Sequence, residues 1–385
     1  MAKDEKLGLY VHIPFCAKKC NYCDFLSAPP GGGDERKKYV EALCREIQRE
    51  GRGCEGYTVD TLFWGGGTPS LLLPEETERV MKALRDSFRI ETDAEITMEV
   101  NPGTVDRAKL ESYGRLGINR LSIGLQSAND EELKELGRIH SWQDFLTTWE
   151  LVRECGFTNV NVDLMSALPG QTREGYENTL RKVLCLEPEH ISAYSLMIEE
   201  GTPFFGRFGP GGGEEDRLPD EETERWMYER TGRLLKTHGY ERYEISNYSR
   251  PGLACKHNIG YWTGKEYLGL GLGASSLIHH RRFSRERDLG AYIRKAMTGE
   301  DTTVWQEDLG LQEEMAEFMF LGLRLTRGIC LKEFEKRFGS SLEENYGKPI
   351  KELKEKGLLY VPQKGRLALT QKGADVSNQV FLEFL

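Results

Sequence analysis

Three cysteines lie close together near the start of the 385-residue chain, in the segment YVHIPFCAKKCNYCDF. Cys16, Cys20 and Cys23 are spaced C-x3-C-x2-C, and the next cysteine, Cys44, follows 21 residues later. A structural zinc site usually has four ligands, and a disulfide framework needs an even number of cysteines. Three thiolates on one loop can instead hold three irons of a 4Fe–4S cubane and leave the fourth iron open. The spacing therefore predicts an iron–sulfur cluster with one free coordination position.

Polar and glycine residues follow several of the predicted strands. The stretch GGGTPS at 65–70 has bare backbone that a ligand can approach closely. Glu99 ends a predicted strand, where a carboxylate suits the hydroxyls of a ribose. Gln126, Arg138 and Asp163 follow later strands, and an arginine can bind a carboxylate through two hydrogen bonds. Because the carboxyl ends of barrel strands meet on one rim, we expect these side chains to surround one ligand.

Strands and helices alternate regularly over the first 200 residues. The strands are expected at 7–13, 59–64, 94–100, 119–125, 158–165 and 190–198. This alternation indicates parallel strands joined by right-handed crossovers, either in a partial barrel or in an open doubly wound sheet. The polar residues at the strand ends favour the partial barrel. The predicted fold class is therefore α/β, a partial (β/α)6 TIM-like barrel with a small C-terminal winged-helix-like domain.

The remainder of the chain is expected to add an extension and that C-terminal domain. GLGLGA at 269–274 is interpreted as a tight turn near the site, because no βαβ unit with an acidic partner follows it. Helices and a two-strand pattern after residue 310 resemble a winged helix. The segment 311–385 has 12 Lys and Arg against 11 Asp and Glu, which favours docking or a lid over DNA binding. The predicted domains are 1–200 (barrel), 201–305 (barrel extension) and 306–385 (winged-helix-like domain).

Composition limits the class of protein further. The net charge of −10 argues against nucleic-acid binding, which needs a basic surface. We expect no signal peptide, because the first residues contain neither an apolar core of about 7–15 residues nor a small-residue cleavage site. We expect no integral membrane segment, because the sequence has no apolar run of about 18 residues. An odd number of cysteines, nine, without an export signal indicates a reducing compartment. The sequence therefore predicts a cytoplasmic protein.

The cysteine motif resembles that of the radical S-adenosylmethionine superfamily. A longer set of motifs is similar to the branch that holds oxygen-independent coproporphyrinogen III oxidase and the HemW-type heme chaperones: YVHIPFC, CNYCDF, WGGGTPS, MEVNPGT, GLQS, LGRIH, DLMSALPGQT and HNIGYW. The resemblance covers nearly the whole chain. It implies a 4Fe–4S cluster on Cys16, Cys20 and Cys23, with S-adenosylmethionine on the open iron. In that superfamily, one electron from the cluster cleaves the cofactor to a 5′-deoxyadenosyl radical.

The resemblance also implies a set of cofactor contacts. They are Tyr10, Tyr22, Gly67, Thr68, Glu99, Gln126, Arg138, Asp163 and Met197. Gln126, Arg138, Asp163 and Met197 match an outer, second S-adenosylmethionine site of the oxidase. One or two molecules of S-adenosylmethionine are therefore expected.

The HNIGYW segment is similar to the heme-contact motif of the HemW type. The resemblance makes His257 a candidate iron ligand and Asn258, Tyr261 and Trp262 candidate heme contacts. A single helical turn would put His257 and Tyr261 on one face, four residues apart. Cys255 is a competing ligand, and a capped loop with two core aromatics is the alternative structure for the motif.

Two functions follow from the resemblance. One is a heme chaperone that binds heme and transfers it to client hemoproteins of the respiratory chain, at the inner face of the membrane. The other is an oxygen-independent coproporphyrinogen III oxidase that makes protoporphyrinogen IX. Phe25 stands where the oxidase motif has a fourth cysteine, and only nine residues precede Tyr10. Both features favour the chaperone and leave open whether the protein is an enzyme.

Overall fold

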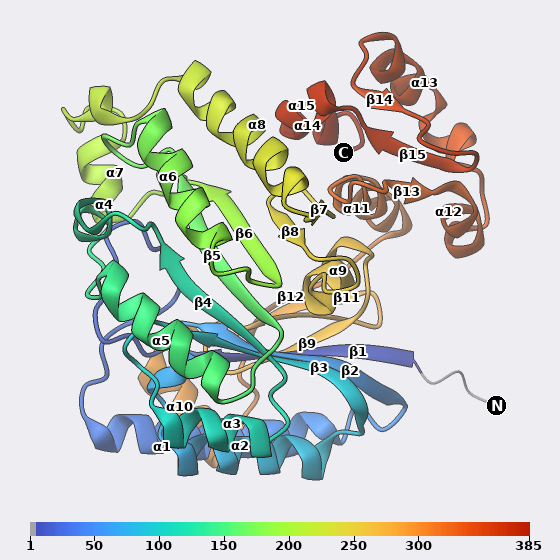
Figure 1. Ribbon diagram of the computed structural model, residues 1–385. Coiled ribbons are helices and arrows are strands. Elements are labelled where there is room, and N and C mark those ends of the chain that lie inside the picture. Colours follow the sequence, from blue (N-terminus) through green and yellow to red (C-terminus); the bar gives the residue numbers. More distant parts are fainter. Residues whose placement is uncertain (1–4) are drawn as a thin grey trace.

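The computed structural model describes residues 5–385, and its main feature is a twelve-stranded sheet with the order β12-β11-β10-β9-β1-β2-β3-β4-β5-β6-β8-β7 (Figure 1). The strands from β9 to β6 are parallel to one another. They are β9 (Tyr267–Leu270), β1 (Glu5–Ile13), β2 (Tyr57–Gly66), β3 (Ile90–Val100), β4 (Arg120–Gln126), β5 (Val160–Ser166) and β6 (His190–Ser195). Strands β1 to β6 follow one another in the sheet without the reversal of order that a doubly wound sheet has, so the predicted α/β partial barrel is confirmed. The sheet is open between β12 and β7.

Amphipathic helices connect the parallel strands. They are α1 (Gly33–Gly51), α2 (Pro74–Ser87), α3 (Arg107–Arg115), α4 (Asp130–Glu135), α5 (Trp142–Glu154) and α6 (Arg173–Leu184). In α5, Phe145, Trp149 and Val152 are buried at a spacing of three to four residues, which is the core-facing stripe of a helix. Ser141 begins α5 with a capping box, because its hydroxyl accepts from the amide of Asp144.

The segment after β6 closes part of the open barrel. It contains α7 (Pro203–Phe208), α8 (Glu221–Thr237), β7 (Glu241–Arg242), β8 (Asn247–Ser249) and α9 (Lys256–Trp262). Strand β8 pairs antiparallel with β6. Helix α9 carries HNIGYW and contacts β2 and β3 at Thr61 and Glu95, well before the carboxyl ends of these strands. The motif and the cysteine loop therefore belong to different ends of the barrel.

The other edge of the sheet is built by β10 (Ser275–Ile278), β11 (Arg281–Arg285), α10 (Leu289–Thr298) and β12 (Thr303–Asp308). The interpretation of GLGLGA as a turn is correct only for 271–274. Gly269 and Leu270 belong to β9, which pairs in parallel with Tyr10 and Val11 of β1. This pairing joins segments about 260 residues apart and has no local signal in the sequence.

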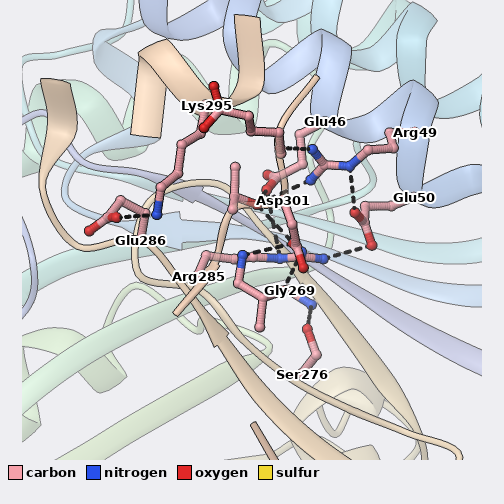
Figure 2. A network of polar contacts seen from close by, with 12 residues as sticks. Glu46, Arg49, Glu50, Gly269, Ser276, Arg285, Glu286, Lys295 and Asp301 are labelled. Atoms are coloured by element: carbon pink, nitrogen blue, oxygen red, sulfur yellow. Dashed lines mark hydrogen bonds and ion pairs between the residues drawn. The ribbon is translucent and has the colours of Figure 1, made fainter. Parts of the chain in front are cut away.

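A buried group of charged residues connects α1 to this edge of the sheet. Arg285 is 1% exposed and lies among Glu46, Glu50 and Asp301, as Figure 2 shows. Its guanidinium is 2.8 Å from Glu50 and 3.6 Å from Glu46. Glu46 also accepts hydrogen bonds from the Tyr292 hydroxyl at 2.8 Å and from the amide of the residue after β9 at 2.7 Å. The network therefore holds the turn after β9 against α1.

The C-terminal domain has its own hydrophobic core. Its elements are α11 (Leu311–Gly322), β13 (Ile329–Cys330), α12 (Leu331–Phe338), α13 (Leu342–Glu355), β14 (Leu359–Tyr360), β15 (Arg366–Leu369), α14 (Gln371–Asp375) and α15 (Ser377–Leu382). The three short strands have the order β13-β15-β14 and pack with the helices around Met319 and Phe334. Met227 and Tyr292 of the extension belong to the barrel core. The exact domain boundaries stay a prediction.

No helix in the described part of the chain is long and apolar enough to cross a bilayer.

Candidate cofactor site and the HNIGYW helix

A cavity opens at the carboxyl ends of the parallel strands. Its wall contains the three clustered cysteines and seven of the nine residues predicted to contact S-adenosylmethionine: Cys16, Cys20, Cys23, Tyr22, Gly67, Thr68, Glu99, Gln126, Arg138 and Asp163. Strand ends separated by up to 147 residues in the sequence therefore meet around one space. This is the arrangement expected for a barrel whose ligand lies at the carboxyl ends of its strands.

The cysteine loop follows β1 and places its three thiols around this cavity. Thr68 Oγ1 lies 3.5 Å from the Cys16 sulfur, and the Arg138 guanidinium lies 3.6 Å from that of Cys20. Burial raises the pKa of the Cys23 thiol, and the neighbouring Cys20 and Cys16 raise it further. A bound cation would reverse this trend, because a thiolate pairs with the metal.

The thiols do not converge on one point. In the described residues, no three side chains of His, Cys, Asp or Glu form a group suited to a single metal ion. A 4Fe–4S cubane takes its thiolates at separate corners, so its ligands stand farther apart than those of one zinc ion. The donor set therefore fits a cluster with three protein ligands, and no fourth cysteine lines the cavity.

The glycine-rich loop after β2 packs on the cysteine loop. The amides of Gly67 and Thr68 donate to the carbonyls of Ile13 and Phe15 at 2.8 and 2.7 Å. A Cβ atom on Gly67 would lie 2.7 Å from the Phe15 carbonyl oxygen, which is too close. Gly67 is therefore needed for backbone contact with the cysteine loop, in addition to the bare surface that it offers to a ligand.

Two carboxyl groups face the cavity. Burial first, and the nearby Asp163 second, raise the pKa of Glu99 to about 8. Burial also raises the pKa of Asp163, whose oxygens accept from Asn161 at 2.7 Å and Ser122 at 3.1 Å. Two carboxyl groups in a poorly solvated space favour a cationic ligand, because a positive charge relieves their repulsion. S-adenosylmethionine has such charges on its sulfonium and ammonium groups.

Arg138 links the strand ends to the cysteine loop. One terminal nitrogen donates to Asn101 Oδ1 at 2.7 Å and to the Gly124 carbonyl at 2.5 Å. Asn101 in turn donates to Thr68 Oγ1 at 2.8 Å. Asn101 and Gly124 line the cavity but were not among the predicted contacts, although both stand in the motifs MEVNPGT and GLQS. Their position becomes evident only when the strand ends are brought together.

Gln126 has a strained backbone at the end of β4. Its φ is 73°, in the left-handed region that residues other than glycine rarely adopt. The pairing register between β4 and β5 shifts at this point, between Gly124 and Gln126. Such a bulge redirects a side chain, and here Gln126 lines the cavity.

Tyr10 and Met197 are not part of the cavity wall. The Tyr10 hydroxyl lies 3.1 Å from His12 Nδ1, and its ring stacks on Phe63 inside the barrel. Met197 lies beyond β6 and is 69% exposed. The structure therefore brings seven of the nine predicted contacts together around one cavity, and the roles of all nine in cofactor binding stay predictions.

His257 points from α9 into the barrel and is only 4% exposed. Its Nδ1 lies 3.0 Å from Thr61 Oγ1, and its Nε2 lies 3.0 Å from the Tyr261 hydroxyl. The prediction that His257 and Tyr261 share one helical face is confirmed. Burial lowers the pKa of His257 to about 3, so the imidazole is neutral. A neutral imidazole can bind iron, but here both of its nitrogens already have hydrogen-bond partners.

Glu95 on β3 fixes the start of α9. Its carboxylate accepts from the amides of Lys256 and His257, both at 3.0 Å, and from the Cys255 thiol. Cys255 is 0% exposed, and burial raises its pKa to about 12. A protonated thiol that is fully buried is poorly suited to bind iron. Cys255 is therefore the N-cap residue of α9.

Trp262 lies at the other end of α9 and faces the C-terminal domain. The guanidinium of Arg324 lies over its indole ring, 4.4 Å from the ring centre. Asn258 and Tyr261 are half-buried between these two ends. Helix α9 therefore connects the barrel interior to the C-terminal domain.

A chain of hydrogen bonds also runs from the cofactor cavity toward the C-terminal domain. Asn161 donates to Asp163, so its carbonyl oxygen faces His190 Nδ1 at 2.6 Å and that nitrogen carries the proton. His190 Nε2 then accepts from the Tyr243 hydroxyl at 2.8 Å. The Tyr243 carbonyl accepts from the amide of Thr326 at 3.0 Å, just after α11. The chain of side-chain hydrogen bonds therefore ends at the Tyr243 hydroxyl, and the Tyr243 backbone makes the contact with the C-terminal domain.

Comparisons with known proteins agree with this geometry. Residues 10–183 match the family described as the Radical SAM superfamily, and residues 309–376 match the HemN C-terminal domain. The heme chaperone HemW of Lactococcus lactis is 36% identical over 335 residues, which cover 87% of this chain and 86% of that protein. The heme chaperone HemW of Escherichia coli is 40% identical over 278 residues, 72% of each chain.

A solved structure is similar over almost the full length. The coproporphyrinogen III oxidase HemN from Escherichia coli, described as a radical SAM enzyme, superposes with a TM-score of 0.85. It is 25% identical, and the match covers 99% of this chain and 90% of that one. The fold and the cysteine-lined cavity define the class, which is that of radical S-adenosylmethionine proteins. Within that superfamily, the chain belongs to the HemW family.

Proposed function

We propose that this protein is a heme chaperone, which binds heme and transfers it to client hemoproteins of the respiratory chain. The observation that carries the proposal is the similarity to HemW proteins over most of their length. Phe25 supports it, because this side chain lines the cofactor cavity and is 68% exposed at the position of the oxidase's fourth cysteine. We place the protein in the cytoplasm, in keeping with its nine free cysteines.

The cofactor cavity would hold the cluster and S-adenosylmethionine. Cys16, Cys20 and Cys23 would bind three irons, and a bound cluster supplies one electron to S-adenosylmethionine. Glu99 and Asp163 would face the positive charges of the cofactor, while Arg138 holds Asn101 and the end of β4 in place. Equilibrium dialysis measures whether one or two S-adenosylmethionine molecules bind.

We propose that heme iron binds to His257. The imidazole is neutral, and Thr61 orients it through Nδ1, as a second hydrogen bond does for many metal-binding histidines. The Tyr261 hydroxyl is hydrogen-bonded to Nε2, so it must move away before the iron can bind to this nitrogen. Asn258, Tyr261 and Trp262 would then form the surface beside the porphyrin.

A heme titration of the reconstituted protein tests this assignment. His257→Ala should weaken heme binding at least tenfold and shift the Soret band, because the axial ligand is lost. Tyr261→Phe should bind heme at least as tightly as the wild type, since the competing hydroxyl is gone. Cys255→Ser is the control and should have the smaller effect. Wild-type affinity and spectrum in His257→Ala would show that the ligand is another residue, with His279 and His280 the next candidates.

A further inference from the structure

Two adjoining cavities form a groove with walls from α8, β7 and the C-terminal domain. Figure 1 labels the backbone of these elements. It consists of two cavities of about 500 and 720 Å³, which share Arg242 and Gln371 in their walls. Sites for small molecules and cofactors typically measure about 300–1,000 Å³. The groove is therefore large enough for a porphyrin, and it is separate from the cofactor cavity at the strand ends.

One wall of the groove is apolar. Its exposed apolar surface comes from Ile245, Tyr360 and Leu369, while Leu323 and Leu325 are 1% and 4% exposed and lie beneath it. Tyr360 is 43% exposed, which leaves much of its ring in contact with solvent. Large apolar side chains on a concave surface favour a flat, apolar ligand, because its burial removes both surfaces from water.

Arg324 lines the same groove, and the nearby Glu244 carboxylate acts on its charge without forming an ion pair. In residues 5–385, its guanidinium forms no hydrogen bond or ion pair, and its buried Nε has no acceptor. Its contact is the face of Trp262, on which it stacks at 4.4 Å. Stacking leaves the N–H groups in the plane of the guanidinium free. A poorly solvated arginine with free donors is a strong binding group for a carboxylate.

Arg242 is the second arginine with free donors. Its Nε donates to the Glu244 carbonyl at 3.1 Å, and its guanidinium stacks on Tyr228 at 4.6 Å. The terminal nitrogens have no acceptor among the residues that the structure describes. Taken together, the two cavity walls contain four basic residues, Arg233, Lys236, Arg242 and Arg324, and two acidic residues, Glu229 and Glu241. The groove is thus basic in a chain of net charge −10.

We propose that this groove binds heme by its two carboxylate groups, with Arg324 and Arg242 as their partners. This proposal rests on the heme-binding function proposed above. It identifies the surface that would bind the edge of the porphyrin that carries the two carboxylates. The apolar wall would cover the ring, and Arg324 would connect the site to HNIGYW through Trp262. Carboxylate binding by arginine and iron binding by His257 involve different groups of the ligand, so each can be tested alone.

The test compares heme with its dimethyl ester, in which both carboxylates are neutral. Wild-type full-length protein should bind the ester about 100-fold more weakly than heme, because two charge-assisted hydrogen-bond pairs are lost. Arg324→Gln and Arg242→Gln should each weaken heme binding about tenfold and leave ester binding unchanged. The double variant should no longer distinguish heme from its ester.

Controls separate a specific effect from a loss of structure. Lys351→Gln, an exposed residue of α13 that lines neither the groove nor the pocket of Trp262, should keep wild-type heme affinity. Arg324→Lys should restore part of the affinity, since it keeps the charge but not the planar pair of donors. Iron content after reconstitution should be the same in all variants, because the cysteine loop lies elsewhere.

Two negative outcomes are distinguishable. If the double variant binds heme as tightly as the wild type, or the wild type binds heme and ester equally, the groove assignment is wrong while the heme-binding function stands. If the wild type shows no saturable binding of heme, the proposed function is wrong, and the groove assignment fails with it.

Discussion

Glu99 and Asp163 are two carboxyl groups that share the wall of one poorly solvated cavity. Burial raises the pKa of both, and for Glu99 it reaches about 8. At pH 7 Glu99 is therefore mostly protonated in the protein without ligand. A ligand that brings positive charge or ribose hydroxyls favours the carboxylate, so its binding must release a proton.

This proton release predicts a pH-dependent affinity for S-adenosylmethionine. Between pH 6.5 and 8, affinity should rise with pH by up to about tenfold per unit and then level off, because above pH 8 no proton needs to leave Glu99. Calorimetric titration in buffers of different ionisation enthalpy measures the released proton. Glu99→Gln should flatten the profile, while the exposed Glu75→Gln should leave it unchanged. An affinity that falls with rising pH would contradict this role.

Helix α1 depends on the buried charges of Figure 2 for its attachment to β9–β12. Glu46 is 0% exposed and accepts hydrogen bonds from Tyr292, Thr302 and the amide of Gly271. A buried ion pair adds little net stability, but removing one partner leaves the other charge without compensation. The network therefore fixes the position of the turn after β9 more than it adds to the free energy of unfolding.

Glu46→Ala should lower the free energy of unfolding by about 3–5 kcal/mol, because Arg285 then loses its most buried partner. Urea denaturation followed by circular dichroism measures the change. Lys82→Gln removes an exposed ion pair with Asp86 on α2 and should change stability by less than about 1 kcal/mol. Equal losses in the two variants would show that the buried network has no special role.

Residues 5–385 form a cavity at the strand ends and, separately, place the HNIGYW helix beside the C-terminal domain. The fold is shared with the oxidase HemN from Escherichia coli, so the overall architecture does not decide between chaperone and oxidase. The chaperone proposal therefore depends on the similarity to HemW proteins and on local features such as Phe25 on the cavity wall.

The chaperone proposal predicts that the protein does not oxidise its relative's substrate. Reconstituted protein with S-adenosylmethionine and reductant should form no protoporphyrinogen IX from coproporphyrinogen III under anaerobic conditions. Escherichia coli HemN serves as the positive control, and a Cys16→Ala variant without the cluster gives the background. Turnover on the order of 1 per second would make the protein an oxidase. Cleavage of S-adenosylmethionine alone would not decide between the two.

The sequence by itself determined the cysteine loop, the alternation of strands and helices, and most of the cofactor cavity. Each of these has a local signal, namely a short spacing, a hydrophobic period or a polar residue at a strand end. Parallel strands then bring Thr68, Glu99, Gln126 and Asp163 together, because their carboxyl ends share one rim.

Only the tertiary structure decided what depends on contacts between distant segments. His257 meets Thr61 across 196 residues, and Glu95 caps the helix of His257 across 162. The pairing of β9 with β1 and the groove around Arg324 likewise join segments far apart in the chain. Such contacts leave no periodic pattern in the sequence. A histidine, an arginine or a glycine-containing strand has the same sequence neighbours whether or not distant segments bury or pair it.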